Sequence, residues 1–331
     1  MLLAIQIGGA TQYPFSLSGR GHGVALFSKS NNALVFARRP GKFGIVFDPR
    51  TGNVRSRILA PLGLHFCGHG VFSDDVRTLY TTENEYASGK GRIGVWDAAN
   101  NFSRVETLFS HGIGPHELCL SYDGKYLVIA NRGIRTHPST GREKLNIATM
   151  EPSLAIINRI TGSLLTKFTL KNARQQKLSI RHVVVGMNGM FCAVMQDQAP
   201  DRKNMPLVAF CRSNESHLFL GAAPRHIQMR MRGYTGSVAL DCGGVFAGVT
   251  APHGNLVTFW DLRTGSYISH TNFSDVCGIS STHTEGEFVM TSGIHGAATF
   301  NVRTGKKNPL PSGFISGRSW DNHLLTARIF V

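Results

Sequence analysis

Histidines recur at one position of a repeating pattern, each just ahead of a short apolar segment. Neutral imidazole binds zinc, copper and iron, so histidines that a repeat brings together predict a transition-metal site. The clearest copies are GRGHGVALFS from Gly19, FCGHGVFSDD from Phe66, GIGPHELCLS from Gly112 and LSIRHVVVGM from Leu178, and a C-terminal copy reads RSWDNHLLTARIF. The five predicted metal ligands are His22, His69, His116, His182 and His323.

Two weaker copies carry Ser237 and Cys277 in the histidine position, which makes seven copies. The spacings between successive positions are 47, 47, 66, 55, 40 and 46 residues, and one four-stranded propeller blade uses roughly 40 to 50 residues. The sequence therefore predicts an all-β fold: a seven-bladed β-propeller that forms a single domain over residues 1–331.

The predicted order of strands in each blade also indicates which other residues lie on the same face of the propeller as the histidines. In an antiparallel blade, the loop that enters the innermost strand and the loop that leaves the second strand open on the same side. The leaving loops carry polar residues toward one mouth of the predicted channel, and the candidate ligand-binding residues among them are Arg38, Arg39, Glu83, Asn131, Arg132 and Gln196.

These residue types suggest two kinds of chemistry. Adjacent guanidinium groups at Arg38 and Arg39 fit a carboxylate or a phosphate, or one of them pairs with Glu83 or Glu85 of the next blade. Glu83, Glu117 and Cys277 could complete or orient a metal shell.

Each of these sites has an architectural alternative. The histidines can serve only to close the ring through hydrogen bonds to neighbouring blades. Cys277 is better explained by packing than as a nucleophile, because Ser237 occupies the equivalent position. The sequence contains no nucleophile elbow, P-loop or helical zinc motif.

Turn motifs and the two chain ends complete the predicted architecture. Strings of the form D-x-x-T-G begin near Phe47, Asn158, Trp260 and Asn301 and predict the outer hairpins of blades. The segment from Asn131 to Pro152 is the one long irregular stretch. The C-terminal SWDNHLLTARIFV is expected to be the innermost strand of the last blade, with LLAIQI and YPFSLS from the N-terminus as its outer strands.

Composition limits the classes of partner. Lys and Arg outnumber Asp and Glu by 35 to 20, a net charge of +15 that favours acidic partners. The basic residues are scattered, which argues against nucleic-acid binding. No apolar run is long enough for a transmembrane segment, and the N-terminus lacks the features of a signal peptide, which leaves a cytoplasmic location open. The six cysteines form no C-x-x-C pair and are expected to be reduced core residues for the most part.

A set of ordered strings, among them GRGHG, FARRPG, FCGHGVFS, YTTENEY, GRIGVWDA, GIGPHEL, ANRGIRTHP and WDNHL, resembles the DUF1513 family of bacterial proteins of unknown function. The resemblance covers nearly the whole chain. It implies a seven-bladed propeller, a periplasmic location, and a role beside imelysin-like iron-uptake proteins and di-haem peroxidase-like proteins.

Three classes of function follow from these observations. The first is a non-enzymatic accessory propeller that binds a metal ion such as Fe, Cu or Zn, a small anion or a partner protein, with a link to iron uptake. The second is a metal-dependent enzyme, either a lactonase-like hydrolase or an oxidoreductase. The third is an interaction platform without a small ligand.

Overall fold

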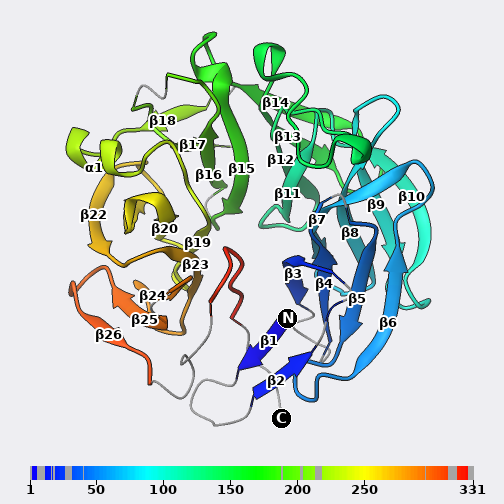
Figure 1. Ribbon diagram of the computed structural model, residues 1–331, viewed down its shortest axis with the longest axis horizontal. Coiled ribbons are helices and arrows are strands. Elements are labelled where there is room, and N and C mark those ends of the chain that lie inside the picture. The colour runs from blue at the N-terminus through cyan, green and yellow to red at the C-terminus, as the bar shows by residue number, and fades with distance from the viewer. Residues whose placement is uncertain are drawn as a thin grey trace. The chain divides into compact units, whose positions relative to one another are not determined.

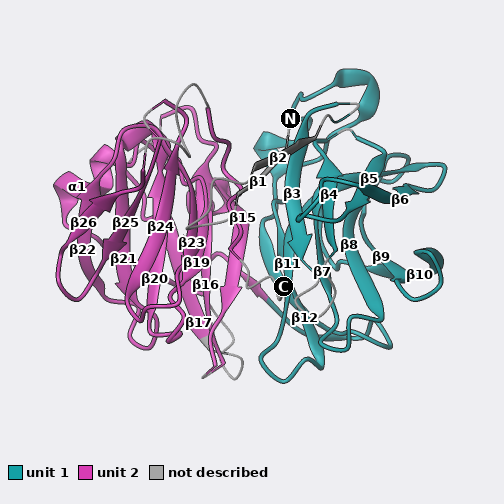
Figure 2. Ribbon diagram, turned by 90° about the horizontal axis from the view of Figure 1, so that it is seen from below, with its two compact units in different colours: residues 1–167, 327–331 teal, residues 168–326 magenta. Residues whose placement is uncertain are grey.

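The structure is a computed structural model that describes residues 2–5, 12–15, 17, 19–26, 32–39, 41–187, 189–201, 204–212, 218–294, 296–311 and 319–326. Contacts within the chain divide it into two compact units (Figure 2). Unit 1 comprises residues 1–167 with 327–331, and unit 2 comprises residues 168–326. The prediction of a single domain stays a prediction.

Unit 1 contains three four-stranded antiparallel sheets in which the spatial order of the strands follows the chain (Figure 1). The first sheet consists of β3 (Gly21–Leu26), β4 (Ala33–Ala37), β5 (Phe43–Phe47) and β6 (Val54–Leu59), and the second of β7 (Leu64–Phe72), β8 (Thr78–Glu85), β9 (Gly91–Asp97) and β10 (Ser103–Phe109). The third sheet consists of β11 (Pro115–Leu120), β12 (Tyr126–Asn131), β13 (Ser153–Asn158) and β14 (Leu164–Thr169). The last two residues of β14 fall in unit 2. A separate two-stranded sheet pairs β1 (Leu2–Ile5) with β2 (Gln12–Phe15).

Unit 2 repeats the same pattern three times. Its strands are β15 (Leu178–Val185), β16 (Met190–Asp197), β17 (Val208–Arg212) and β18 (Phe219–Gly221); β19 (Val238–Leu240), β20 (Phe246–Ala251), β21 (Leu256–Asp261) and β22 (Tyr267–Asn272); and β23 (Val276–Ser281), β24 (Glu287–Ser292), β25 (Gly296–Asn301) and β26 (Lys307–Pro309). The helical segments in the described residues are α1 (Arg225–Arg230) and the short 3-10 turns η1 (Pro138–Thr140), η2 (Ile147–Thr149), η3 (Gln175–Lys177) and η4 (Pro252–Gly254). None of the described helices has the length and apolar character needed to cross a bilayer.

The cores lie between successive sheets. Along β8, Leu79 packs with Phe36 and Phe66 of one cluster, whereas the next residue, Tyr80, packs with Ile129 of another cluster. This alternation follows from the two-residue period of a strand that is buried on both faces. The outermost strands β6, β10 and β14 are mostly exposed, whereas the second strands of the same sheets, β4, β8 and β12, are mostly buried.

The outer hairpins are confirmed. The D-x-x-T-G strings connect the third strand to the fourth in the sheets that contain β5, β13, β21 and β25. In the first of them the Asp48 carboxylate accepts a hydrogen bond of 2.9 Å from the Arg50 amide, and Gly52 adopts φ 74°. Asn158, Asp261 and Asn301 accept the equivalent backbone bonds in the other three turns. The side chain at the first position therefore closes each turn, and glycine supplies the positive φ.

The described residues contain six four-stranded sheets, not the seven that the repeat predicted. Successive antiparallel sheets of this kind are typical of propeller blades. The seventh blade was to be completed by both chain ends, yet β1 pairs with β2 alone and residues 319–326 form no strand. The remainder of that predicted C-terminal strand, residues 327–331, lies outside the described residues. Closure of a ring is therefore not seen in the described part of the chain.

Candidate functional site

The repeated histidines of unit 1 lie on the first strand of each of its four-stranded sheets. His22 is on β3, His69 on β7 and His116 on β11, and β7 contacts both other strands. In each sheet the start of the first strand pairs with the end of the second, as in the pairs Gly21–Ala37 and Pro115–Asn131. The predicted sharing of one side by entering and leaving loops is thus confirmed within these sheets.

Each of the three histidines sits in a β-bulge. On β3, His22 and Gly23 face the single residue Phe36 of the partner strand. On β11, His116 is an extra residue between two paired positions. The bulge on β7 is larger and runs from Cys67 to His69. Because a bulge breaks the alternation of a strand and redirects a side chain, it can turn an imidazole toward a neighbouring sheet.

Glycines allow the bulges to approach one another. Gly68 adopts φ 107°, and a Cβ atom placed on it would lie 2.2 Å from Cδ2 of His22. A Cβ atom on Gly23 would lie 2.5 Å from the carbonyl oxygen of Gly68 and 2.9 Å from Nδ1 of His69. The G-H-G strings of β3 and β7 therefore have a steric cause, since only glycine fits where the two strands meet.

The three imidazoles form a compact group, which we call the histidine trio. The ring centroids of His22 and His69 are 4.9 Å apart, those of His22 and His116 5.5 Å, and those of His69 and His116 4.8 Å. One ring nitrogen from each residue lies within 4.8 Å of the others. Zinc–nitrogen bonds of 2.0–2.1 Å place tetrahedral ligands about 3.3 Å apart, which is closer than the 4.8 Å limit within which these three nitrogens lie.

Neighbouring polar groups orient the histidine trio. Glu117 Oε1 lies 3.4 Å from Nδ1 of His69, the kind of carboxylate–imidazole contact that fixes the orientation of a histidine ring. The hydroxyl of Thr82, on β8, lies 3.2 Å from the carbonyl oxygen of His69 and 3.1 Å from that of His116. One buried side chain therefore ties the bulges of two adjacent sheets together.

Some of the predicted ligand-binding residues of unit 1 form hydrogen bonds or ion pairs within the fold, and the others are arginines. Glu83 is fully buried and accepts bonds of 2.6 and 2.9 Å from Arg104, and Glu85 accepts from Arg92, so neither glutamate pairs with the arginines after β4 as one alternative proposed. Asn131 is buried and donates to the carbonyl oxygen of Ser110.

Two of the predicted arginines come together. Arg39 follows β4 and Arg132 follows β12, and each guanidinium is close enough to the buried Cys67 to affect the pKa of its thiol. Arg38 is half-buried, and its backbone amide donates to the carbonyl oxygen of Arg20.

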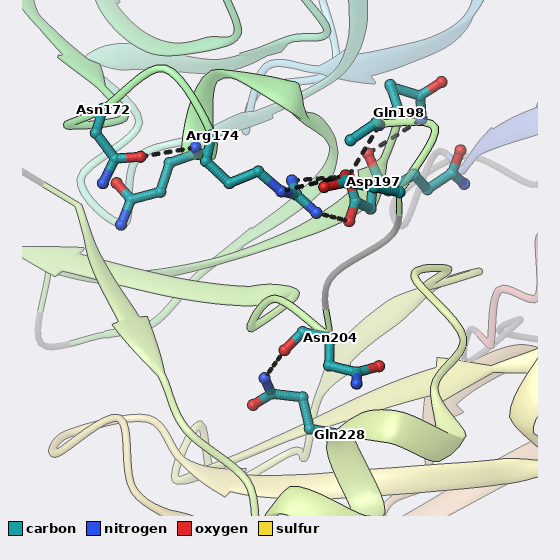
Figure 3. A network of polar contacts seen from close by, with 10 residues as sticks. Asn172, Arg174, Asp197, Gln198, Asn204 and Gln228 are labelled. Atoms are coloured by element: carbon teal, nitrogen blue, oxygen red, sulfur yellow. Dashed lines mark hydrogen bonds and ion pairs between the residues drawn. The ribbon is translucent and has the colours of Figure 1, made fainter.

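The remaining predicted residues belong to unit 2. Gln196, at the end of β16, donates to the carbonyl oxygen of Thr235. The following residue, Asp197, is held by both terminal nitrogens of Arg174 (Figure 3). The rings of His182 and His323 lie 5.5 Å apart. These contacts give Gln196 a structural bond and place two of the five predicted histidines side by side.

The six cysteines all lie in the described part of the chain, and none of them forms a disulfide there. Burial raises the pKa of the Cys277 thiol to about 12, with a further contribution from Asp275. The thiol is therefore protonated at neutral pH, which agrees with a packing role and not with a nucleophile. Cys242 is exposed and is an exception to the predicted burial.

Sequence reasoning missed His65 and Asn84, which lie at the start of β7 and the end of β8. The amide nitrogen of Asn84 lies 3.2 Å from Nε2 of His65 and 3.4 Å from the carbonyl oxygen of Thr136. The alternation of His65, Cys67 and His69 along one strand was the available signal, since such residues start on one face.

Comparison with known proteins identifies a family. The sequence profile of the family described as "Protein of unknown function (DUF1513)" matches residues 15–327. A search of curated proteins found no match. Since the matched region spans nearly all of the 331 residues, the chain belongs to the DUF1513 family.

Proposed function

We propose that this protein is an accessory, non-enzymatic metal-binding protein whose site is the histidine trio of unit 1. The observation that carries the proposal is the convergence of His22, His69 and His116 from three sheets, with ligand atoms within 4.8 Å of one another. Burial of His69 and His116, the glycines that make room for them and the carboxylate beside His69 all support a site that is built for imidazole ligands.

The ligand set selects the class of metal. Three imidazoles suit zinc, copper(II) or iron(II) better than calcium or magnesium, which prefer oxygen ligands. Three protein ligands also leave a coordination position open. In an accessory protein, that position would accept a donor from a partner or from a small chelator, which fits transfer of a metal ion.

The cellular part of the proposal rests on family resemblance. We place the protein in the periplasm, with iron-uptake proteins as its partners and iron as the first metal to test. The high positive charge of +15 supports an acidic surface on such a partner.

The architectural part of the proposal concerns the seventh blade. The seven sequence copies support a ring in which both chain ends contribute to one further sheet. Such a ring would place the first strands of all sheets around one channel, which is how propellers present a central ligand site.

Metal binding is tested first by titration calorimetry with zinc, copper(II) and iron(II). We expect the wild type to bind at least one of these ions more tightly than about 100 µM, a free energy of about 5.5 kcal/mol. The double variant His69→Ala/His116→Ala should lose binding, because only one ligand of the trio is left. The control is His283→Ala, which removes an exposed histidine from another part of the chain.

Two outcomes would overturn the proposal. Equal affinity of the double variant and the control would show that the metal binds elsewhere, and failure of the wild type to bind any of the three ions would make the histidines architectural. Hydrolysis of a lactone or an ester by the metal-loaded wild type, lost in the double variant, would favour the enzyme over the accessory role.

A further inference from the structure

Unit 1 presents a cationic surface with a projecting leucine at the end of the sheets where β7 begins and β8 ends. Its residues come from the loop before β7 (residues 60–63), the loop after β8 (residues 86–90), the loop after β12 (residues 132–152) and the position just before β5. The leucine–cation surface, as we call it, consists of Lys42, Leu62, Tyr86, Lys90 and Arg135.

Leu62 lies at the corner of a tight turn. The amide of Leu64 donates to the carbonyl oxygen of Pro61 over 3.0 Å, and Gly63 adopts φ 83°. A glycine with positive φ at the third position is typical of a type II turn, which makes Leu62 the second residue of that turn. Its side chain is 99% exposed, more than any other large apolar side chain of the described residues. The turn therefore presents this leucine to the surroundings in a fixed place.

Tyr86 fixes the turn against its neighbours. Its amide donates to the carbonyl oxygen of Gly63 over 3.1 Å, and its hydroxyl donates to that of Leu64 over 2.9 Å. Its ring is stacked with the ring of His65, with centroids 5.8 Å apart and an angle of 15° between the planes. Nζ of Lys42 lies 5.7 Å from the centroid of the same tyrosine ring. The projecting turn and the ammonium group of Lys42 thus share one aromatic neighbour.

Two more cations lie at the turn that follows Tyr86. The carbonyl oxygen of Lys90 accepts from the amide of Glu85 over 3.1 Å. A Cβ atom on Gly89 would lie 2.6 Å from Nε of Arg135, so the arginine side chain rests against the backbone of this turn. Both side chains are exposed, as is that of Lys42.

The loop that carries Arg135 is itself well anchored. Asn146 donates to the carbonyl oxygen of Gly133 over 3.0 Å and accepts from the backbone amide of Arg135 over 2.7 Å. Ile134 and Met150 are almost fully buried. The long irregular segment predicted from the sequence is therefore a structured cover, and Arg135 has a fixed place on it.

The positive charge of this surface is not neutralised within the fold. Lys42, Lys90 and Arg135 form no ion pair with a carboxylate in the part of the chain that the structure describes. Glu85, which ends β8, is bound by Arg92. A surface with an excess of cations attracts an anionic partner.

We propose that the leucine–cation surface binds an anionic lipid bilayer, with Leu62 entering the interfacial region and the three cations contacting lipid phosphates. Membrane-surface binding of this kind combines buried apolar area with attraction to anionic lipids, and each Lys or Arg near the bilayer contributes to it. A fluid bilayer accepts a projecting side chain without a preformed pocket, whereas a protein partner needs a surface of matching shape. Leu62 projects from a turn, which favours the bilayer.

This role goes beyond the proposed metal site and does not depend on it. No residue of the leucine–cation surface belongs to the histidine trio, and all of its members lie on loops between strands or at the residue before a strand. Metal-free protein should therefore bind vesicles, and the double variant His69→Ala/His116→Ala should bind them as the wild type does.

The test is co-sedimentation of metal-free protein with vesicles of phosphatidylcholine alone or with about 30% phosphatidylglycerol. We expect the wild type to bind the anionic vesicles and to dissociate when salt is raised from about 0.05 M to about 0.5 M. Leu62→Ser should lower the partition coefficient at least about tenfold, the loss expected when one leucine side chain stays out of the apolar region. The control Leu165→Ser, which changes a 57% exposed leucine on the outer strand β14, should lower it less than about twofold.

A second pair of variants separates this surface from the charge of the whole molecule. Lys42→Gln/Arg135→Gln should lower the partition coefficient at least about tenfold, because both cations face the bilayer. Arg57→Gln/Lys167→Gln removes the same charge from exposed positions on the outer strands β6 and β14. This control should lose less than about threefold, since its cations lie away from the bound surface.

A third variant reports insertion directly. Leu62→Trp should keep at least the wild-type affinity, because tryptophan favours the membrane interface. Its added fluorescence should shift to shorter wavelength on anionic vesicles. Both variants at Leu62 should melt at the wild-type temperature without lipid, since this side chain makes almost no contact with the fold.

Three results would overturn the proposal. The first is a wild type that does not bind the anionic vesicles at low salt, and the second is equal loss of binding in the two double charge variants. The third is wild-type binding by Leu62→Ser. If the wild type binds soluble polyglutamate but not the vesicles, the surface serves an acidic protein instead of a bilayer.

Discussion

At the scale of single residues, His65 shows how the surroundings fix a protonation state. It is 1% exposed, its two ring nitrogens contact the carbonyl oxygen of Phe66 and the amide of Asn84, and the nearby cations oppose a further positive charge. A histidine with a lowered pKa in the folded state favours folding when it is neutral. The unfolded chain, with an ordinary histidine pKa near 6.5, takes up a proton first as the pH falls.

We therefore expect His65 to make unfolding depend on pH between about 6.5 and 4. Its contribution to the free energy of unfolding should fall by about 2 kcal/mol from pH 7 to pH 5. Urea denaturation of the wild type and of His65→Gln at both pH values measures this, and the variant should lose that part of the pH dependence. The exposed histidine variant His283→Gln should keep the wild-type slope, and an equal slope in all three proteins would contradict the assignment.

At the scale of the strand, the β-bulges carry the repeated histidines that form the histidine trio. Gly68 is the position where the requirement is strictest, because a side chain there would both be strained at φ 107° and overlap the ring of His22. A substitution at this position should displace one ligand of the trio without removing any imidazole.

We expect Gly68→Ala to weaken metal binding at least about tenfold, a loss of about 1.4 kcal/mol, and to destabilise the fold. Gly63→Ala is the matched control: Gly63 has φ 83° just before the same strand, but a Cβ atom there would contact nothing within 4 Å. It should lower stability through backbone strain and leave the metal affinity unchanged. Calorimetric titration with metal measures the affinity of both variants. Similar metal affinities in the two variants would mean that the overlap with His22 is unimportant.

The strands and turns could be predicted from the sequence because their causes are local. Alternating and continuous apolar runs located the strands, and Asp or Asn with glycine located the outer turns at Asp48, Asn158, Asp261 and Asn301. The bulges could not be predicted, since a register shift depends on how two strands pair. The ion pair of Glu83 with Arg104 was missed for the same reason, because it joins residues on nonadjacent strands of one sheet.

At the scale of the whole molecule, the histidine trio brings together residues that are far apart in the sequence, one from each of three successive sheets. His22 and His116 are separated by 94 residues, and each ligand belongs to a separately hydrogen-bonded sheet. A metal ion bound by all three would link these sheets and bind the folded state alone.

Metal loading should therefore stabilise the protein by mass action. With free metal at one hundred times its Kd, the gain is about 2.7 kcal/mol, which should raise the melting temperature by several degrees. Differential scanning calorimetry with and without metal measures this in the wild type and in His69→Ala/His116→Ala. A comparable rise in the double variant would assign the stabilisation to another metal site.

The order of strands within each sheet also affects how the chain reaches its folded state. Every four-stranded sheet in the described residues is built from strands that are consecutive in the sequence, so most hydrogen-bonded partners are separated by short loops; β12 and β13, joined by residues 132–152, are an exception. Low sequence separation favours rapid formation of contacts, and each sheet can assemble as its segment leaves the ribosome. The trio, in contrast, stays incomplete until the third sheet has docked. A metal ion that required all three imidazoles would bind only after translation had passed β14, so premature capture of metal by the nascent chain would be avoided.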